Sequence, residues 1–371
     1  MDKHLHIVTH DIPWPADYGG VVDLFYKIRS LHALGIKIHL HCYYSAARVK
    51  QTELLKYCDS VDYYPRKKNF SFRIPYIVQS RSDKGLLAKL QQDDHPVLLE
   101  GIHCTYLLKK GALDGRKVFV RLHNVEYKYY RQLAKHEINI FKKIYYSYEG
   151  FLLKKYERSI ANKAVFWPVS TDDTKLYKKE FHAEKIAFLP VFLPWNEIST
   201  QPGKGCFCLY HGNLSVNENE KAADWLLNNV FNTLEIPFVI AGKNPSLPLQ
   251  TLAHSHAHTC MAVNPSDVEM QDLIKKAQVN ILPSFNKTGV KLKLLNALYN
   301  GRHCLVNNAG KEGAAIDGLC SIAETADDFK MMIKKLFQEN FTAEALDKRQ
   351  QMLQAMYDNE KNAKQLITWI Y

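Results

Sequence analysis

Short apolar runs alternate with helical stretches along nearly the whole chain, and this alternation restricts the folds that the chain can adopt. Each run is rich in valine, isoleucine, leucine or aromatic residues and is followed by a segment in which apolar residues recur at helical spacing. Strands and helices that alternate in this way build parallel sheets with helices on their faces. The sequence therefore predicts an α/β fold.

The predicted strands fall into two groups. In the first half of the chain they are Leu5–His10, Ile36–Tyr44, Val61–Tyr64, Pro96–Gly101, Lys117–His123, Ala164–Ser170 and Ile186–Phe192. In the second half they are Cys206–Gly212, Pro237–Lys243, Thr259–Pro265, Val279–Ser284 and His303–Asn308. A proline-marked stretch from Leu193 to Gly205 separates the groups and resembles an interdomain linker.

The chain has 371 residues, which is enough for two well-packed domains. We predict two Rossmann-like parallel-sheet domains that face each other across a cleft, residues 1–195 and 196–350. Residues 351–371 are predicted to form a C-terminal helix that packs back toward the N-terminal domain. Ligands of such sheets bind beyond the carboxyl ends of the strands, so the loops at those ends should carry the function.

The chain is basic, with a formal net charge of +11. A basic field attracts phosphates of every kind, so nucleic acid, anionic lipid headgroups and nucleotide-sugars all fit the charge. The sequence contains no zinc finger, RNP-type aromatic motif or basic low-complexity arm. We therefore expect no nucleic-acid partner.

The sequence predicts neither a membrane span nor a metal centre. It lacks an apolar run long enough to cross a bilayer, and its charged start leads into a strand, so we expect a cytoplasmic protein. The eight cysteines form no C-x-x-C pair. His254, His256 and His258 resemble a metal-binding tract, but a solvated loop explains them at least as well.

The stretch from Asn286 to Gly301 joins a glycine to a lysine-bearing helix just after a predicted strand. We predict that this helix begins near Gly289 with Thr288 as its cap, so that free backbone N–H groups face an anion. Gly289, Lys293 and Asn296 would share one helix face that could bind a ligand. A surface helix with solvated lysines is the alternative.

Paired glycines, Gly19 and Gly20, follow the first predicted strand and precede an amphipathic helix. Without side chains they let the backbone approach a ligand closely, although a plain turn would also use them. Asp17 beside them could accept a hydrogen bond from a substrate hydroxyl, or it could cap the helix.

The fifth predicted strand ends in polar residues at the expected ligand edge: Arg121, His123, Asn124 and Glu126. A histidine in this position suits binding or proton chemistry, and Arg121 and Asn124 could orient an acceptor or a sugar. The alternative is that His123 and Asn124 cap the next helix.

A basic and aromatic helix is predicted from Glu137 to Lys163. Helices of this kind often rest on anionic membrane surfaces, so the protein could also be peripheral on the inner face of the membrane. A helix with its aromatic side in the core and its lysines in solvent explains the same pattern.

In order and spacing, these segments resemble the GT-B-fold glycosyltransferases, in particular the large family-four, group 1, retaining type. The resemblance covers nearly all of the chain and rests on DYGGVVDLFYKIRSLHALG, RLHNVEYKYYRQLA, YERSIANKAVFWPVSTDD, AFLPVFLPW, YHGNLSVNENEKAADWLLNNV, FVIAGKNPS and ILPSFNKTGVKLKLLNALYNG. It implies that a sugar moves from a nucleoside-diphosphate sugar, held mainly by the C-terminal domain, to an acceptor held by the N-terminal domain. The resemblance implies no metal ion and no other cofactor.

Position by position, the resemblance assigns Gly19 and Gly20 to the surroundings of the donor phosphates and the transferred sugar. His123 matches a histidine near that sugar, and Gly212 matches the glycine of the first loop in the C-terminal domain. Lys293 matches the lysine that binds the diphosphate, so the resemblance implies that it stabilises the leaving group while His123 orients the sugar.

The chain departs from the family pattern at three positions. Thr288 and Asn296 stand where the family commonly has two glutamates, and Asn213 stands where many members have an arginine. Asn296 could still bind a ribose, but as a neutral amide rather than as a charged acceptor.

The implied function is a hexosyltransferase-type activity that builds a cell-surface glycan or a glycolipid on a lipid-linked acceptor. The missing glutamates leave a second hypothesis open, a catalytically silent GT-B scaffold that binds a glycan, a nucleotide or a partner protein.

Overall fold

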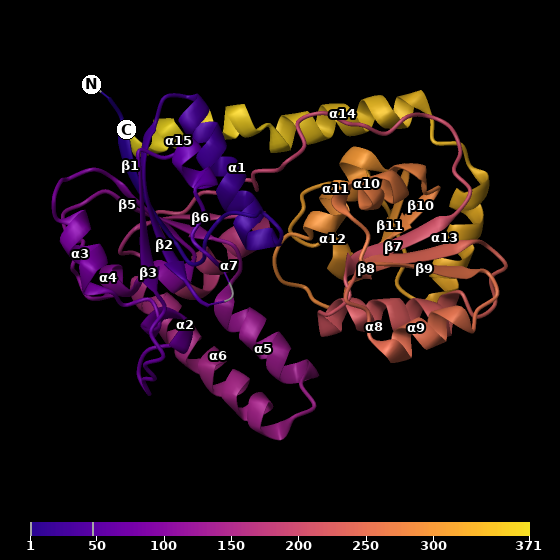
Figure 1. Cartoon of the computed structure of the whole chain (residues 1–371), viewed down its shortest axis with the longest axis horizontal. Coiled ribbons are helices and arrows are strands. Elements are labelled where there is room, and N and C mark those ends of the chain that lie inside the picture. The colour runs from indigo at the N-terminus through magenta and orange to yellow at the C-terminus, as the bar shows by residue number, and fades with distance from the viewer. Residues whose placement is uncertain (1, 47) are drawn as a thin grey trace. The chain divides into compact units, whose positions relative to one another are not determined.

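The computed structural model describes residues 2–46 and 48–371, which form two compact α/β units (Figure 1). Unit 1 consists of Met1–Pro194 and Tyr357–Tyr371, and unit 2 consists of Trp195–Met356. Each unit contains one six-stranded parallel sheet, so the predicted α/β class is confirmed.

The sheet of unit 1 has the strand order β3-β2-β1-β4-β5-β6. Its strands are β1 (His4–Thr9), β2 (Lys37–Tyr44), β3 (Ser60–Pro65), β4 (Val97–Glu100), β5 (Val118–Leu122) and β6 (Val165–Pro168). The order reverses between β1 and β4, and in sheets of this type ligands bind beyond the carboxyl ends of the strands at such a reversal.

The helices of unit 1 lie between these strands and at the C-terminus. They are α1 (Gly19–Ala33), η1 (Glu53–Lys56), α2 (Tyr76–Gln79), α3 (Lys84–Leu90), η2 (Ile102–Cys104), α4 (Tyr106–Lys109), α5 (Glu126–His136), α6 (Ile140–Ile160), α7 (Thr171–Phe181) and α15 (Asn359–Ile370). Helices α5 and α6 pack side by side as a hairpin (Figure 1). Helix α15 packs against α1.

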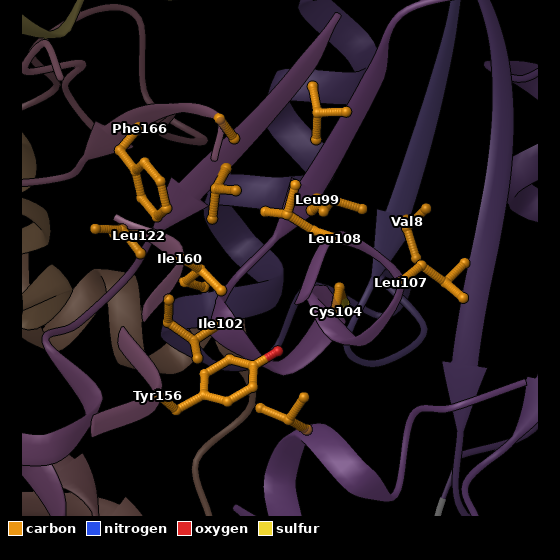
Figure 2. Packing of buried hydrophobic residues seen from close by; sticks show 14 of the residues in the cluster. Val8, Leu99, Ile102, Cys104, Leu107, Leu108, Leu122, Tyr156, Ile160 and Phe166 are labelled. Carbon is orange, nitrogen blue, oxygen red and sulfur yellow. The ribbon is translucent and has the colours of Figure 1, made fainter. Parts of the chain in front are cut away.

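Two apolar clusters cover the two faces of this sheet. Because successive strand residues point to opposite faces, Val8 joins one cluster and Ile7 joins the other. Figure 2 shows part of the first cluster, which includes Tyr156 and Ile160 of α6 and Leu99 of β4. The second cluster includes the apolar residues of α1 and α15.

Unit 2 repeats the design with the strand order β12-β11-β10-β7-β8-β9. Its strands are β7 (Cys208–Asn213), β8 (Phe238–Lys243), β9 (Thr259–Val263), β10 (Val279–Ile281), β11 (His303–Val306) and β12 (Ser321–Ile322). Its helices are α8 (Asn217–Trp225), η3 (Leu226–Val230), α9 (Leu247–His254), α10 (Asp267–Lys276), α11 (Leu292–Asn300), α12 (Asn308–Lys311), α13 (Ala326–Gln338) and α14 (Ala343–Tyr357). Across the described parts of both units, no helix has the length and apolar character that a membrane span requires.

The strand predicted at Ile186–Phe192 is wrong. Ile186 forms an isolated bridge with Phe166, and the N–H groups of Ala187 and Leu189 donate to the carbonyl groups of Phe166 and Pro168, but the run does not become a strand. The carbonyl groups of Leu189 and Pro190 instead accept hydrogen bonds from the buried Arg121 side chain. Proline also has no N–H to donate to a neighbouring strand.

Candidate functional site

The loop after β10 has a different shape from the predicted helix start. Helix α11 begins at Leu292, and Gly289 has a φ of +66°, a left-handed conformation that does not continue a helix. The backbone N–H and the hydroxyl of Thr288 both donate to Oδ1 of Asn286. The predicted helix start near Gly289 and the predicted Thr288 cap are therefore wrong, because the Asn286 side chain holds this segment as a turn.

Lys293 lies in the first turn of α11 and reaches toward β7 and α8. Its Nζ lies 3.1 Å from Oδ1 of Asn219, 3.4 Å from the hydroxyl oxygen of Tyr210 and 4.9 Å from the centre of the Tyr210 ring. Among the described residues, no carboxylate forms an ion pair with Lys293. Burial lowers its pKa to about 8, although the charge of Glu218 raises it. A partly buried cation of this kind is stabilised when an anion binds to it.

Asn219 orients this lysine, and sequence reasoning missed it. Its Oδ1 accepts the hydrogen bond from Lys293, while its Nδ2 donates to the carbonyl oxygen of Asn213 at 2.9 Å. A Cβ atom on Gly212 would lie 3.3 Å from Cγ of Asn219, so the glycine lets that amide approach β7 closely. The side chain of Asn213 turns into its own loop, where Oδ1 accepts from Ser215.

Two further side chains shape the same edge. Glu218 of α8 accepts hydrogen bonds from Ser284 and Asn286, and so ties α8 to the loop after β10. Asn296 is half-buried on α11, and its Oδ1 accepts a hydrogen bond of 2.7 Å from Asn300. Lys293, Gly212, Asn213 and Asn219 therefore gather at the carboxyl edge of the second sheet, with Asn296 one turn further along α11.

In unit 1, His123 lies at one end of a buried chain of charges. Its Nε2 lies 3.0 Å from Oε2 of Glu100, whose Oε1 lies 2.8 Å from Nζ of Lys27. Lys27 also lies 3.0 Å from Asp23, which forms a two-point ion pair with Arg121. Burial alone would raise the pKa of Asp23, but the charges of Arg121 and Lys27 hold that pKa well below its usual range. This series of buried charges holds Glu100 in place, and Glu100 in turn fixes the orientation of the His123 ring.

Arg121 is not available to a sugar or an acceptor, which corrects the sequence prediction. Its side chain is fully buried, and besides Asp23 it donates to the carbonyl groups of Trp167, Leu189 and Pro190. Asp23, Glu100 and His123 are close enough together to hold a metal ion, but Lys27 already supplies the positive charge between the two carboxylates.

The other predicted residues of unit 1 lie around the same edge. Gly19 and Gly20 are the first residues of α1, and a Cβ atom on Gly20 would lie 3.2 Å from Nε2 of His10. Asp17 does not cap α1; its Oδ1 pairs with Arg48 at 2.7 Å in an exposed loop. Asn124 is half-buried just before α5.

Two more histidines stand beside His123, and sequence reasoning missed both. The ring centre of His10 lies 5.2 Å from that of His103 and 5.7 Å from that of His123. Nδ1 of His10 and Nδ1 of His103 are buried and have no hydrogen-bond partner among the described residues. Both histidines end or closely follow predicted strands, so the rule that selected His123 could also have found them.

Glu126, three residues after His123 in the sequence, is buried, and burial raises its pKa to about 8, against the opposing effects of Arg81 and Asn124. Burial lowers the pKa of His10 and of His103 well below the ordinary value. The carboxyl edge of the first sheet therefore presents neutral imidazoles and a protonatable acid, groups that can bind hydroxyl groups or exchange protons.

The comparisons with known proteins agree with this architecture. Residues 206–339 match the family model described as glycosyl transferases group 1. An "uncharacterized 44.6 kDa protein in cps region" of Klebsiella pneumoniae is 28% identical over 329 residues, which cover 83% of each chain.

Two solved structures share the fold at low sequence identity. A sucrose-phosphate synthase from Thermosynechococcus elongatus has a TM-score of 0.72 and 13% identity, and the match covers 99% of this chain and 98% of that one. Anabaena Alr3699/HepE, solved in complex with UDP and glucose, has a TM-score of 0.64 and 10% identity, with 99% of each chain covered. The whole chain therefore has the GT-B glycosyltransferase fold, and its residues 206–339 match the group 1 glycosyl transferases.

Proposed function

We propose that the protein transfers a sugar from a nucleoside-diphosphate sugar to a cell-surface glycan or a lipid-linked acceptor, with retention at the anomeric carbon and without a metal ion. The observation that carries the proposal is Lys293, a half-buried ammonium group without an ion-pair partner among the described residues. It stands at the amino end of α11, beyond the carboxyl edge of the second sheet.

Sugar transfer requires positive charge next to the diphosphate leaving group. When the bond between the sugar and the diphosphate breaks, negative charge develops on the leaving oxygen. Lys293 and the first backbone N–H groups of α11 can stabilise that charge, because a helix amino end carries a partial positive charge. The bound diphosphate would in turn raise the pKa of Lys293 and keep it protonated.

We assign the donor ribose to Asn296. Its Oδ1 is engaged by Asn300, so its amide N–H groups are the ones left to bind a hydroxyl oxygen. This reverses the hydrogen-bond direction that a glutamate would impose, and it removes a charge from the site. Asn213 and Gly212 would border the diphosphate from the β7 side.

We assign the acceptor and the orientation of the transferred sugar to unit 1. His123 is held by Glu100, and beside it stand His10 and His103, whose buried Nδ1 atoms have no hydrogen-bond partner among the described residues. Asn124 borders the same group. Polar atoms of this kind can bind the hydroxyl groups of a carbohydrate.

A surface of unit 1 supports a membrane-bound acceptor. Along the start of α6 and the loop before it, Ile138 is 89% exposed and Phe141 is 79% exposed. Phe72 is 75% exposed, and its carbonyl oxygen accepts a hydrogen bond from Tyr148 of α6. Lysine doublets lie along the same helix. Apolar side chains flanked by lysines suit the anionic inner face of a membrane.

The relatives support the donor and acceptor classes by analogy. The Klebsiella relative is a protein of a cps region, and the Anabaena structure contains UDP and glucose. Calorimetry of the purified protein with a panel of UDP-, GDP- and ADP-sugars tests the proposal. Binding of one donor, followed by transfer to a glycan or lipid-linked acceptor, is expected. Failure of the folded protein to bind any of these donors would contradict it.

A catalytically silent scaffold is the second candidate. Thr288 and Asn296 replace two glutamates of the family pattern, and the Thr288 hydroxyl is already bound to Asn286. This candidate predicts donor binding without turnover. Measurable sugar transfer or donor hydrolysis would exclude it.

A further inference from the structure

A group of histidines gathers in unit 1 at the amino-terminal part of the sheet, the opposite end from the groups described above. His4 and His6 lie on β1, His39 and His41 lie on β2, and His95 lies just before β4. Residues two apart on a strand point to the same face, so the side chains of both strands meet on one side of the sheet. The proposed transfer reaction uses none of them.

We propose that His4, His39 and His95 bind one divalent transition-metal ion of the zinc class. Each offers a ring nitrogen, and these nitrogens lie within 4.8 Å of one another. All three residues are half-buried, so an ion can reach them from solvent. Neutral imidazole is a preferred ligand of Zn²⁺, Ni²⁺ and Cu²⁺, whereas Mg²⁺ and Ca²⁺ prefer oxygen ligands.

The ring nitrogens of His4 on β1 and His39 on β2 are already separated by nearly the distance that a shared metal ion requires. Nδ1 of His4 lies 3.0 Å from Nε2 of His39, within hydrogen-bond distance, and the two rings are 8° from parallel. In a tetrahedral zinc site the ligand nitrogens lie about 3.3 Å apart, given Zn–N distances of about 2.0 to 2.1 Å. Rotation of the two rings would turn both nitrogens toward one ion, and the proton of their hydrogen bond would leave to solvent.

The surrounding contacts hold the ligands in place. Nδ1 of His39 lies 3.0 Å from the Ser60 hydroxyl, which selects Nε2 as the metal-binding atom. The backbone of His95 is held by Asp93 and Arg116, through bonds of 3.0 Å and 3.2 Å. The carbonyl oxygen of His4 accepts a hydrogen bond from the Tyr371 hydroxyl at 2.5 Å.

His6 and His41 are not ligands in this proposal, because they are buried and satisfied. Nδ1 of His6 lies 2.9 Å from Nε2 of His41, Nε2 of His6 lies 3.0 Å from Asp93, and Nδ1 of His41 lies 3.0 Å from the Tyr64 hydroxyl. Three protein ligands leave a fourth position for water. A bound ion would link β1, β2 and the segment before β4, and would stabilise unit 1 by mass action.

The test uses the full chain with no affinity tag, stripped of metal with a chelator and titrated with ZnCl₂ by calorimetry near neutral pH. One ion per chain should bind, with proton release and a higher melting temperature. His95→Ala and His4→Ala should each weaken binding by at least about tenfold.

The matched control is His254→Ala/His258→Ala, which removes two exposed histidines of the separate tract in unit 2. This control should bind zinc as the unchanged protein does. The proposal is overturned if the unchanged protein binds no zinc, if His95→Ala binds it equally well, or if the unit 2 variant alone loses binding. Near-UV circular dichroism of each variant verifies the fold, and His95 lies outside the strands, so its replacement leaves their pairing intact.

Discussion

Nε2 of His123 lies 3.0 Å from Oε2 of Glu100, and this contact joins the candidate site of unit 1 to a chain of buried charges that continues through Lys27 and Asp23 to Arg121. Of the five residues, His123 alone is not fully buried. The other four charged side chains are buried beneath the site, and they fix the orientation of the His123 ring.

Glu100→Gln should reduce the rate of sugar transfer, and because it removes one of the two countercharges of the buried Lys27 it should also lower stability, so its rate is measured well below its melting temperature. The neutral amide has the same shape, but it holds the His123 ring and its charged form less firmly. We expect kcat to fall about tenfold, with a smaller change in KM and a shifted pH profile. The control is Glu184→Gln on the exposed surface. An unchanged pH profile would mean that Glu100 only packs beneath the site.

Asp23→Asn should destabilise unit 1. It would leave both Lys27 and Arg121 with less countercharge in the interior, and breaking a buried ion pair in this way costs about 3 to 5 kcal/mol. Urea unfolding measures the loss, and Asp267→Asn is a control, because that side chain is 98% exposed. Equal midpoints for the two variants would show that the buried charges are compensated in another way.

Lys293→Ala should weaken donor binding by about 1.5 to 3 kcal/mol, the usual contribution of a hydrogen bond to a charged group. The diphosphate would lose the ammonium group but keep the amino end of α11. Lys287→Ala is the matched control, because Lys287 is an exposed lysine in the same loop. If calorimetry gives the same affinity for both variants, Lys293 does not bind the donor.

The stability of unit 1 should fall as the pH rises from about 4.3 toward about 8. Burial raises the pKa of Glu157 to about 8, while its bonds to Tyr177 and to the backbone of Tyr127 oppose the shift and the charges of Glu126 and Asp173 add to it. A raised pKa means that the folded state favours the protonated acid. The stability is therefore complete below the unfolded pKa of about 4.3 and is lost as the pH passes through about 8.

Glu157→Gln mimics the protonated acid and provides the test. The free energy of unfolding of this variant should change less between neutral and alkaline pH, by at least about 1 kcal/mol. Glu126 has the same raised pKa, so part of the dependence should remain. If the variant loses stability with pH as steeply as the parent chain, Glu157 is already ionised in the fold.

Replacing Ile138 and Phe141 together by serine should weaken binding to vesicles that contain anionic lipid, while donor binding stays the same. Both residues are among the most exposed large apolar side chains of unit 1. Val268→Ser is the control, because Val268 is 80% exposed in unit 2. Co-sedimentation measures the effect. Equal sedimentation of the two variants, or no binding of the parent chain, would remove the α5–α6 hairpin as a membrane surface.

Most strands were predictable, because a buried parallel strand needs a short apolar run and the chain marks each run with turn residues. The run from Ile186 to Phe192 has the same composition but does not form a strand. Its carbonyl groups bind the guanidinium of Arg121, which is distant in the sequence. Apolar composition predicts that a segment is buried, but it does not predict which groups its backbone will hydrogen-bond.

The candidate sites were predictable in part. Lys293 and His123 could be selected from their positions next to strand ends, whereas the start of α11 was misplaced because the Asn286 side chain competes for the backbone of Thr288. Arg121 was assigned to a ligand because its partner Asp23 is 98 positions away in the chain. His10 and His103 also stand at strand ends, but their closeness to each other and to His123 depends on β1, β4 and β5 lying side by side.

The sequence by itself determined the alternation of strands and helices, and hence the α/β class and the edges where polar loops collect, because periodicity and turn chemistry act over neighbouring residues. Only the tertiary structure decided which polar groups became partners: Lys293 with Asn219, His123 with Glu100, and His4 with His39. Such pairs join residues far apart in the chain, and burial then sets their charges, so neither the pairing nor the charge state is encoded in any local pattern.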